Sequence, residues 1–328
     1  MSSADSVRQG IYHSGLVRRV VRWLDATPHP SIACEIAADY VAAARWTRGG
    51  SGGLDSFAVE PLPDGAIVAT PVEANIVDVD EVRAAVGRVF SRLRTRDEDV
   101  ALLLPDPVVR VFVLHFDTFP RKADEAIPIL RWRLKKSVPF EAEETLISYM
   151  RQPPKDEGVD IVTALARLRI VREYETLIES VGLSPGVVMS STLAALPLLP
   201  DSKPALLARV AGTSLTTAIV REGMLCGYRC ITLPSDARHV SPQALLDEIY
   251  PLSAYYQDSW SEGIAEVRLA GLAERMAEFR ETFERELKCP VHSLLAGAES
   301  EGQIRTEEKE LVDRGLEALI GWTLNRGS

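Results

Sequence analysis

The sequence 102-LLLPDPVVRVFVLHFDTFPRKADEAIPILRWRLKKSVPFEAEETLISYM-150 contains most of the signals that decide the fold. An apolar strand ends at Pro105, a β-rich run covers Val108 to Phe116, and a helix follows it. The helix pattern stops at residues 138–140, where a proline lacks the backbone donor that a helix needs, and another strand begins beyond them. No catalytic motif lies in this stretch, so it bears on the fold.

Length and composition indicate an ordinary globular protein. The chain has 328 residues, 46% of them hydrophobic and 26% charged, which favours two domains or one large bilobal domain. The formal net charge of −10 argues against a nucleic-acid partner, because phosphate neutralisation needs a basic surface. No signal peptide is evident, and no run approaches the roughly 20 apolar residues that span a bilayer.

The cysteines do not indicate a metal site. Cys226 and Cys230 are four residues apart in a strand pattern, which puts them on one face, but no second pair completes a zinc site. Cys34 and Cys289 are isolated. We therefore expect no metal and a reducing, cytoplasmic compartment.

Residues 1–30 precede the first core strand and contain a short basic amphipathic helix pattern at residues 15–24. Its apolar side chains recur at helical spacing, and Arg18, Arg19 and Arg22 take the other face. One interpretation is a peripheral membrane contact, with the arginines at anionic lipid. The other, which we favour, is a helix packed on the domain with a solvated polar face.

From residue 31 onward, one pattern occurs twice: a β-meander followed by alternating helices and strands. We expect a first lobe at 31–198, with an inserted subdomain at about 107–167, and a second lobe at 199–328. Within the second lobe, a helix is predicted over Pro242 to Trp260 and a last helix over Glu307 to Leu324. In the insertion, Pro128 predicts either a kink or a helix start near Ile127.

Five short motifs in this order resemble one family. They are Leu103-Pro105, Val109-Val113, Phe119-Pro120, Val138-Phe140 and Glu144-Tyr149. Their order and spacing resemble PilM, the cytoplasmic actin-like protein of type IV pilus assembly, and are also similar to the cytoplasmic domain of GspL. The resemblance covers about 31 to 326. It implies an α/β, actin-like fold of two ribonuclease-H-like halves with a cleft between them and an inserted α+β subdomain.

The nucleotide motifs that this resemblance demands are degenerate. Where family members read like DIGSSSVK, this chain has Glu35 in place of the aspartate and Ala37 in place of the glycine, while Asp39 lies at the turn. In the second half, Arg209 stands where the metal-side aspartate belongs, and an arginine repels a magnesium ion. Gly212, Thr213 and Ser214 remain there and could form a turn with exposed N–H groups.

The adenosine-side motif, like LSGG in the family, reads Leu269-Ala270-Gly271-Leu272 here. We expect Leu272 to extend towards the nucleotide and Gly271 to do no more than cap a turn. The three degenerate sites together predict a pseudo-ATPase with no catalytic residues, holding no cofactor or, alternatively, ATP without magnesium. The alternative from another class is an active ATP-binding enzyme of the actin and sugar-kinase superfamily, with Glu35 or Asp39 as the metal-side carboxylate.

One inserted helix is basic in an otherwise acidic chain. Its residues are Arg121, Lys122, Arg131, Trp132, Arg133, Lys135 and Lys136. We favour a solvated helix face; the other interpretations are a docking face for an acidic partner or for lipid headgroups.

The resemblance also implies a function. The chain would be a cytoplasmic, non-catalytic scaffold of a type IV pilus or type II secretion-like complex at the inner membrane. It would bind the cytoplasmic tail of a PilN-like membrane protein, alongside other components of that complex, in a groove between the first lobe and the inserted subdomain.

Overall fold

The computed structural model describes residues 30–47, 53–93, 99–141, 144–153, 158–200, 202–300, 302 and 304–324. The basic amphipathic helix predicted at residues 15–24 lies outside the described residues.

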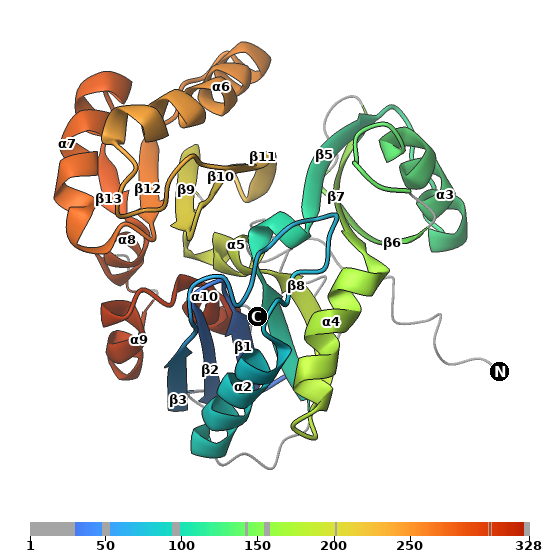
Figure 1. Cartoon of the computed structure of the whole chain (residues 1–328). Coiled ribbons are helices and arrows are strands. Elements are labelled where there is room, and N and C mark those ends of the chain that lie inside the picture. Colours follow the sequence, from blue (N-terminus) through green and yellow to red (C-terminus); the bar gives the residue numbers. More distant parts are fainter. Residues whose placement is uncertain are drawn as a thin grey trace.

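Two five-stranded sheets form the centre of the molecule and have the same strand order (Figure 1). The first has the order β3-β2-β1-β4-β8 and the second the order β11-β10-β9-β12-β13. In each, a three-strand antiparallel meander is followed by two parallel strands. The strands are β1 (Ile32–Ile36), β2 (Tyr40–Trp46), β3 (Leu54–Pro61), β4 (Asp99–Leu104), β8 (Ser184–Ser190), β9 (Ala205–Ala211), β10 (Ser214–Arg221), β11 (Met224–Thr232), β12 (Glu266–Ala270) and β13 (Val291–Ser293). The predicted duplication is thereby confirmed.

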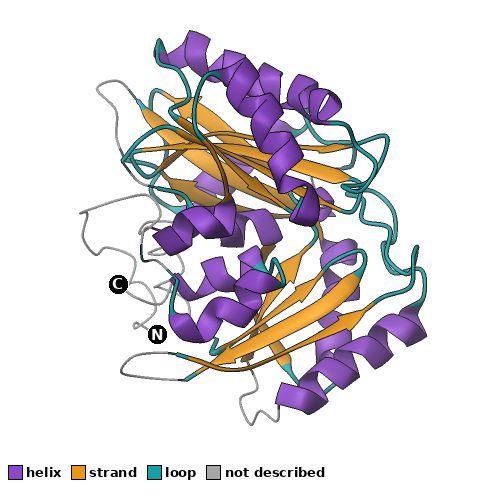
Figure 2. Cartoon of the chain, turned by 90° about the vertical axis from the view of Figure 1, so that its left-hand side faces the viewer, coloured by secondary structure: helices purple, strands orange, loops and turns teal. Residues whose placement is uncertain are grey.

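Helices flank both sheets (Figure 2). They are α2 (Val79–Leu93), α4 (Leu168–Glu179), α5 (Ser191–Ala195), α6 (Pro242–Trp260), α7 (Met276–Leu287), α8 (Leu294–Ser300), α9 (Lys309–Asp313) and α10 (Glu317–Leu324). Helix α6 has the predicted bounds, because the Ser241 hydroxyl accepts from the Ala244 N–H and proline takes the first turn. The single helix predicted over 307–324 is wrong: Gly315, at φ +66°, separates α9 from α10.

The C-terminal helix returns to the first lobe. Helix α10 packs against α5 and β1, although the sequence pattern assigned 199–328 to the second lobe. Gly321 makes this packing close, since a Cβ there would lie 2.2 Å from the Ala194 carbonyl oxygen. The Trp46 indole of β2 also donates to Glu308, at 3.3 Å. The last part of the chain therefore packs on the first lobe.

The inserted subdomain is a three-stranded antiparallel sheet covered by one helix. Its elements are β5 (Arg110–Phe116), α3 (Ala123–Leu134), β6 (Thr145–Arg151) and β7 (Val159–Arg167), with the strand order β5-β7-β6. Ala126 and Leu130 of α3 pack against Ile161 of the sheet. Because α3 begins at Ala123, the predicted start near Ile127 is wrong, and Pro128 lies inside the helix.

Candidate functional site

Charged side chains from the two lobes meet in the middle of the molecule. Strands β1, β4 and β8 are parallel, so their carboxyl ends lie at one edge of the first sheet. Glu35 near the end of β1 and Asp106 just after β4 lie at this edge, which is the edge where ligands bind in open α/β sheets. Arg209 of β9 reaches them from the second lobe.

Arg209 forms two ion pairs across this interface. Its Nη2 lies 2.8 Å from Glu35 Oε1, and its Nη1 lies 3.3 Å from Asp106 Oδ2. The three side chains are at most 5% exposed. Burial lowers the pKa of Arg209, but the carboxylates of Glu35 and Asp106 outweigh it and raise the pKa overall. The guanidinium therefore remains charged and joins the lobes.

Asp106 connects more elements than any candidate that the sequence pattern identified, and the sequence analysis missed it. It accepts from the Thr192 N–H at 2.9 Å and from the Thr192 hydroxyl, at the start of α5. From the second lobe, it accepts from the Thr216 hydroxyl at 3.0 Å and the Tyr228 hydroxyl at 3.4 Å. One signal was available: an aspartate between two prolines directly after a buried strand.

Glu317, at the start of α10, is a further buried carboxylate near Arg209 that the sequence analysis missed. Burial raises the pKa of Glu317, while the nearby Arg209 and the N–H of Gly271 oppose that rise. Glu317 is 108 positions after Arg209 in the sequence, so only the fold brings the two together at this interface.

The hairpin turns of the two halves face each other. Residues 37–40 turn tightly between β1 and β2, with the Ala37 N–H donating to the Tyr40 carbonyl at 2.9 Å. Gly212 and Thr213 form the matching turn between β9 and β10, with Gly212 at φ +56°. A Cβ on Gly212 would lie 3.7 Å from the Ala38 Cβ, which is ordinary van der Waals contact. The two turns therefore face each other with room for about one methyl group between them, where the actin-like resemblance would put phosphates.

The remaining candidates of the cleft do not converge on one point. Asp39 and Thr213 are exposed, and Ser214 is partly buried at the start of β10. Leu272 does not extend into the cleft as expected: it is 3% exposed and packs in the core of the second lobe. Gly271 does more than cap a turn, because at φ +76° a Cβ would lie 1.8 Å from the Val210 carbonyl oxygen. The backbone there needs glycine.

This arrangement does not fit a magnesium-bound nucleotide. Arg209 itself supplies a positive charge between Glu35 and Asp106, and a guanidinium cannot accept a metal ion. Among the residues that the structure describes, no group of three or more His, Cys, Asp and Glu side chains could hold a metal. The geometry of this interface thus favours a permanent internal ion-pair network.

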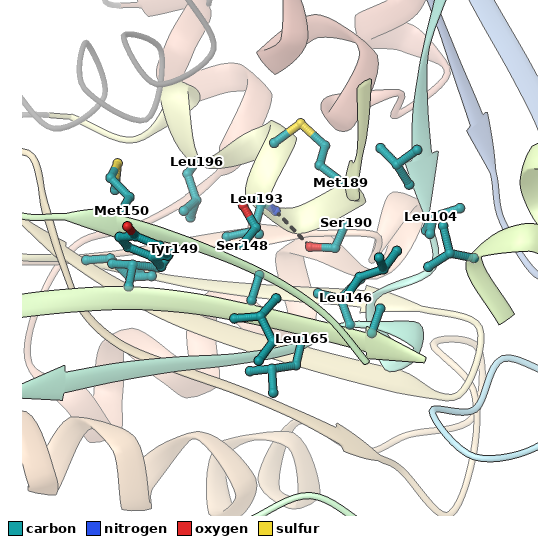
Figure 3. Close-up of a pocket in the computed structure, with 18 residues that line it drawn as sticks. Leu104, Leu146, Ser148, Tyr149, Met150, Leu165, Met189, Ser190, Leu193 and Leu196 are labelled. Atoms are coloured by element: carbon teal, nitrogen blue, oxygen red, sulfur yellow. Dashed lines mark hydrogen bonds between the residues drawn. The ribbon is translucent and has the colours of Figure 1, made fainter. Parts of the chain in front are cut away.

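A separate apolar groove of about 260 Å³ lies between the first lobe and the inserted subdomain (Figure 3). Strand β6 contributes Ser148 and Met150, strand β8 contributes Met189 and Ser190, and Leu193 comes from α5. Strands β6 and β8 are edge strands of their sheets, so within the part of the chain that the structure describes each has one side without a neighbouring strand.

The second lobe closes one part of this groove. The side-chain amide of Gln152, just beyond β6, donates to the Leu225 carbonyl at 2.9 Å and accepts from the Leu225 N–H at 2.8 Å. Leu225 lies in β11 and also lines the groove. The groove therefore has walls from both lobes and from the insertion.

Comparison with known proteins agrees with this geometry. Residues 35–196, which include the first lobe and the insertion, match the family model of the type IV pilus assembly protein PilM. Over these residues the chain is similar to PilM. A solved structure of a PilM–PilN type IV pilus biogenesis complex is similar, with a TM-score of 0.69 and 18% identity over 90% of this chain and 98% of that one.

Two other solved structures are similar. A protein of unknown function with an actin-like ATPase fold from Bacteroides thetaiotaomicron has a TM-score of 0.50 and 11% identity, covering 88% of this chain and 97% of that one. The cytoplasmic domain of EpsL, an inner-membrane component of the type II secretion system of Vibrio cholerae, has a TM-score of 0.47 and 12% identity, covering 83% and 93%. The likeness to the PilM of the PilM–PilN complex and to the Bacteroides protein confirms the expected actin-like fold.

The basic residues of the insertion lie away from the groove. Arg121, Lys122, Trp132, Arg133, Lys135 and Lys136 are exposed, and Arg131 is partly buried. Alternate residues of β7 face opposite ways: Ile161 packs against α3, whereas Val162 packs against the core of the first lobe. Within the described residues, no helix is long and apolar enough to span a membrane.

The ion pairs of Arg209 predict a large loss of stability on its removal. Arg209→Met should lower the free energy of unfolding by about 3–5 kcal/mol, because Glu35 and Asp106 would lose their buried counter-charge. Urea unfolding measures the change. Adding Glu35→Gln to Arg209→Met should restore part of the loss, and a cost below about 1 kcal/mol for Arg209→Met would contradict a lobe-joining role.

The close approach at Gly271 predicts a second loss of stability. Gly271→Ala should lower the midpoint of thermal unfolding, because its Cβ would overlap the Val210 carbonyl and because positive φ strains alanine. Gly263→Ala is the matched control, since no atom lies within 4 Å of a Cβ built there. Equal midpoints for the two variants would show that the β9–β12 approach is not as close as described.

Proposed function

We propose that this PilM-like protein is a non-catalytic cytoplasmic scaffold of a type IV pilus or type II secretion-like complex at the inner membrane. Its groove would hold the cytoplasmic tail of a PilN-like membrane protein. One observation carries the proposal: an apolar groove lies between the first lobe and the insertion of a chain that is similar to the PilM of a PilM–PilN complex.

The chemistry of the groove suits a short extended peptide. Leu146, Met150 and Leu193 offer an apolar surface to apolar side chains of the tail. The free side of β6 or β8 can pair with the backbone of the tail, which is how edge strands bind extended peptides. A tail that is disordered when free would lose conformational entropy on binding, so we expect moderate affinity.

The ion-pair network supports the absence of ATP hydrolysis. Glu35, one of the two carboxylates proposed for an active enzyme, is paired with Arg209. Asp39, the other, is exposed and takes no part in the network. Because the turns at Ala38 and Gly212 also lie close together, we propose a pseudo-ATPase in which the chain's own ion pairs take the place of the metal.

A groove-blocking variant tests partner binding. Ser148→Trp places an indole in the groove from β6 and should weaken binding of a synthetic peptide of the PilN-like tail from the same organism by at least about tenfold, a change of about 1.4 kcal/mol. Titration calorimetry measures it. Ser56→Trp is the matched control, because Ser56 is also a partly buried serine on an edge strand, β3.

Ser56→Trp should bind the peptide like the unaltered protein. Equal affinity of Ser148→Trp and Ser56→Trp would remove the groove as the binding site. Thermal unfolding of both variants establishes that each is folded.

Calorimetric titration of ATP tests the pseudo-ATPase. Neither heat of binding nor a thermal shift is expected at millimolar ATP, with or without magnesium, because Arg209 supplies the cation of the cleft. Micromolar, magnesium-dependent binding would contradict the proposal and favour an ATP-binding enzyme, with Glu35 and Asp39 as the carboxylates to alter.

A further inference from the structure

The outer face of α3 carries apolar and basic side chains together. Pro128, Ile129, Trp132, Arg133 and Lys136 lie at spacings of three and four residues, which brings them to one side of the helix and its C-terminal turn. Trp132 is 77% exposed and Ile129 is 38% exposed. A tryptophan this exposed on a folded surface is unusual, since its ring offers a large apolar area.

The charge around this face is opposite to that of the whole protein. Residues 121–136 contain six basic and two acidic residues, whereas the full chain has 37 basic and 47 acidic residues. The two acidic residues, Asp124 and Glu125, lie in the first turn of α3, and Glu125 is 3.7 Å from Lys122. Beyond that turn, the face carries only positive charge, because Arg131, Arg133, Lys135 and Lys136 follow without an acidic residue.

The fold presents this face outward. Ala126, Leu130 and Leu134 are buried and anchor the other side of α3 to the inserted sheet. The helix lies at an outer edge of the molecule, away from both central sheets (Figure 1). The partner groove is on the opposite side of the inserted sheet, so the face can make a contact while the groove is filled.

We propose that the outer face of α3 docks on an anionic lipid bilayer. Trp132 and Ile129 would enter the headgroup region, where the amphipathic indole ring is favourable. Arg133, Lys135 and Lys136 would meet lipid phosphates while their alkyl stems lie along the apolar boundary. A protruding aromatic tip ringed by cations suits a broad, flat surface, whereas the described groove for a peptide is elsewhere.

The expected binding is weak and depends on salt. Each basic residue near an anionic surface contributes on the order of 1 kcal/mol, so a few of them give binding that is measurable at low ionic strength and is screened at high ionic strength. Reversing two of these charges should therefore reduce the vesicle partition coefficient by more than about tenfold.

Vesicle flotation of the full chain tests the proposal. The vesicles contain either phosphatidylethanolamine with phosphatidylglycerol or phosphatidylcholine alone. The unaltered protein should float with the anionic vesicles at low salt and remain behind with the neutral ones. Trp132→Ala and the double variant Arg133→Glu/Lys136→Glu should each lose about tenfold or more of the bound fraction.

Two control variants distinguish binding through the outer face of α3 from binding through basic residues elsewhere in the chain. Arg280→Glu/Arg285→Glu reverses two exposed charges on α7 in the second lobe and should float like the unaltered protein. Arg18→Glu/Arg19→Glu/Arg22→Glu examines the N-terminal segment, and a loss confined to this variant would overturn the proposal. Normal flotation of the α3 variants would also overturn the proposal. So would a failure of the unaltered protein to float, and that result would favour an acidic protein as the partner of α3.

Discussion

One buried guanidinium holds the two halves of this molecule in a fixed relation. Arg209 of the second lobe pairs with Glu35 and Asp106 of the first, and Asp106 also accepts from Thr216 and Tyr228 across the same interface. Such a network is strong only when complete, since each charge has left water and depends on the others for compensation. Where an actin-like fold has its cleft, this chain has a buried, charged interface. Its cation is part of the chain and cannot dissociate.

The network and the groove are adjacent, because one residue belongs to both. Ser190 lines the groove, caps α5 through the Leu193 N–H, and lies 3.5 Å from the Tyr228 hydroxyl that reaches Asp106. Gln152 links the insertion to Leu225 of the second lobe at the other end of the same wall. Fixing the lobes therefore fixes the shape of the groove. Binding to a preformed groove costs less conformational entropy than binding to one that must first be ordered. This property suits the proposed scaffold better than a cleft that opens and closes with nucleotide.

Much of this fold could be predicted from the sequence, since its signals are local. Ser241 and the proline after it set the start of α6, and the alternation of meander and helices revealed the duplication. The break at Gly315 was missed because the apolar spacing continues across it. At the cleft, the pattern identified Arg209 as a residue that would repel a magnesium ion. Its neighbours Asp106 and Glu317 were missed because they meet it through contacts between residues more than a hundred positions apart. The side-chain direction of Leu272 likewise depends on packing that no local pattern specifies.

The Arg209 network, the apolar groove and the outer face of α3 differ in their chemistry, and the proposed scaffold function assigns a different contact to each. The interface around Arg209 is buried and charge-paired, so it can hold the lobes together. The groove is apolar and bordered by free strand edges, so it can take an extended segment. The outer face of α3 is convex, basic and aromatic, so it suits a surface instead of a segment. If a membrane-protein tail fills the groove while α3 meets lipid, each contact raises the effective concentration of the other, and two weak interactions hold the protein at the bilayer. The inserted sheet makes this combination possible, because its two faces serve the two contacts separately.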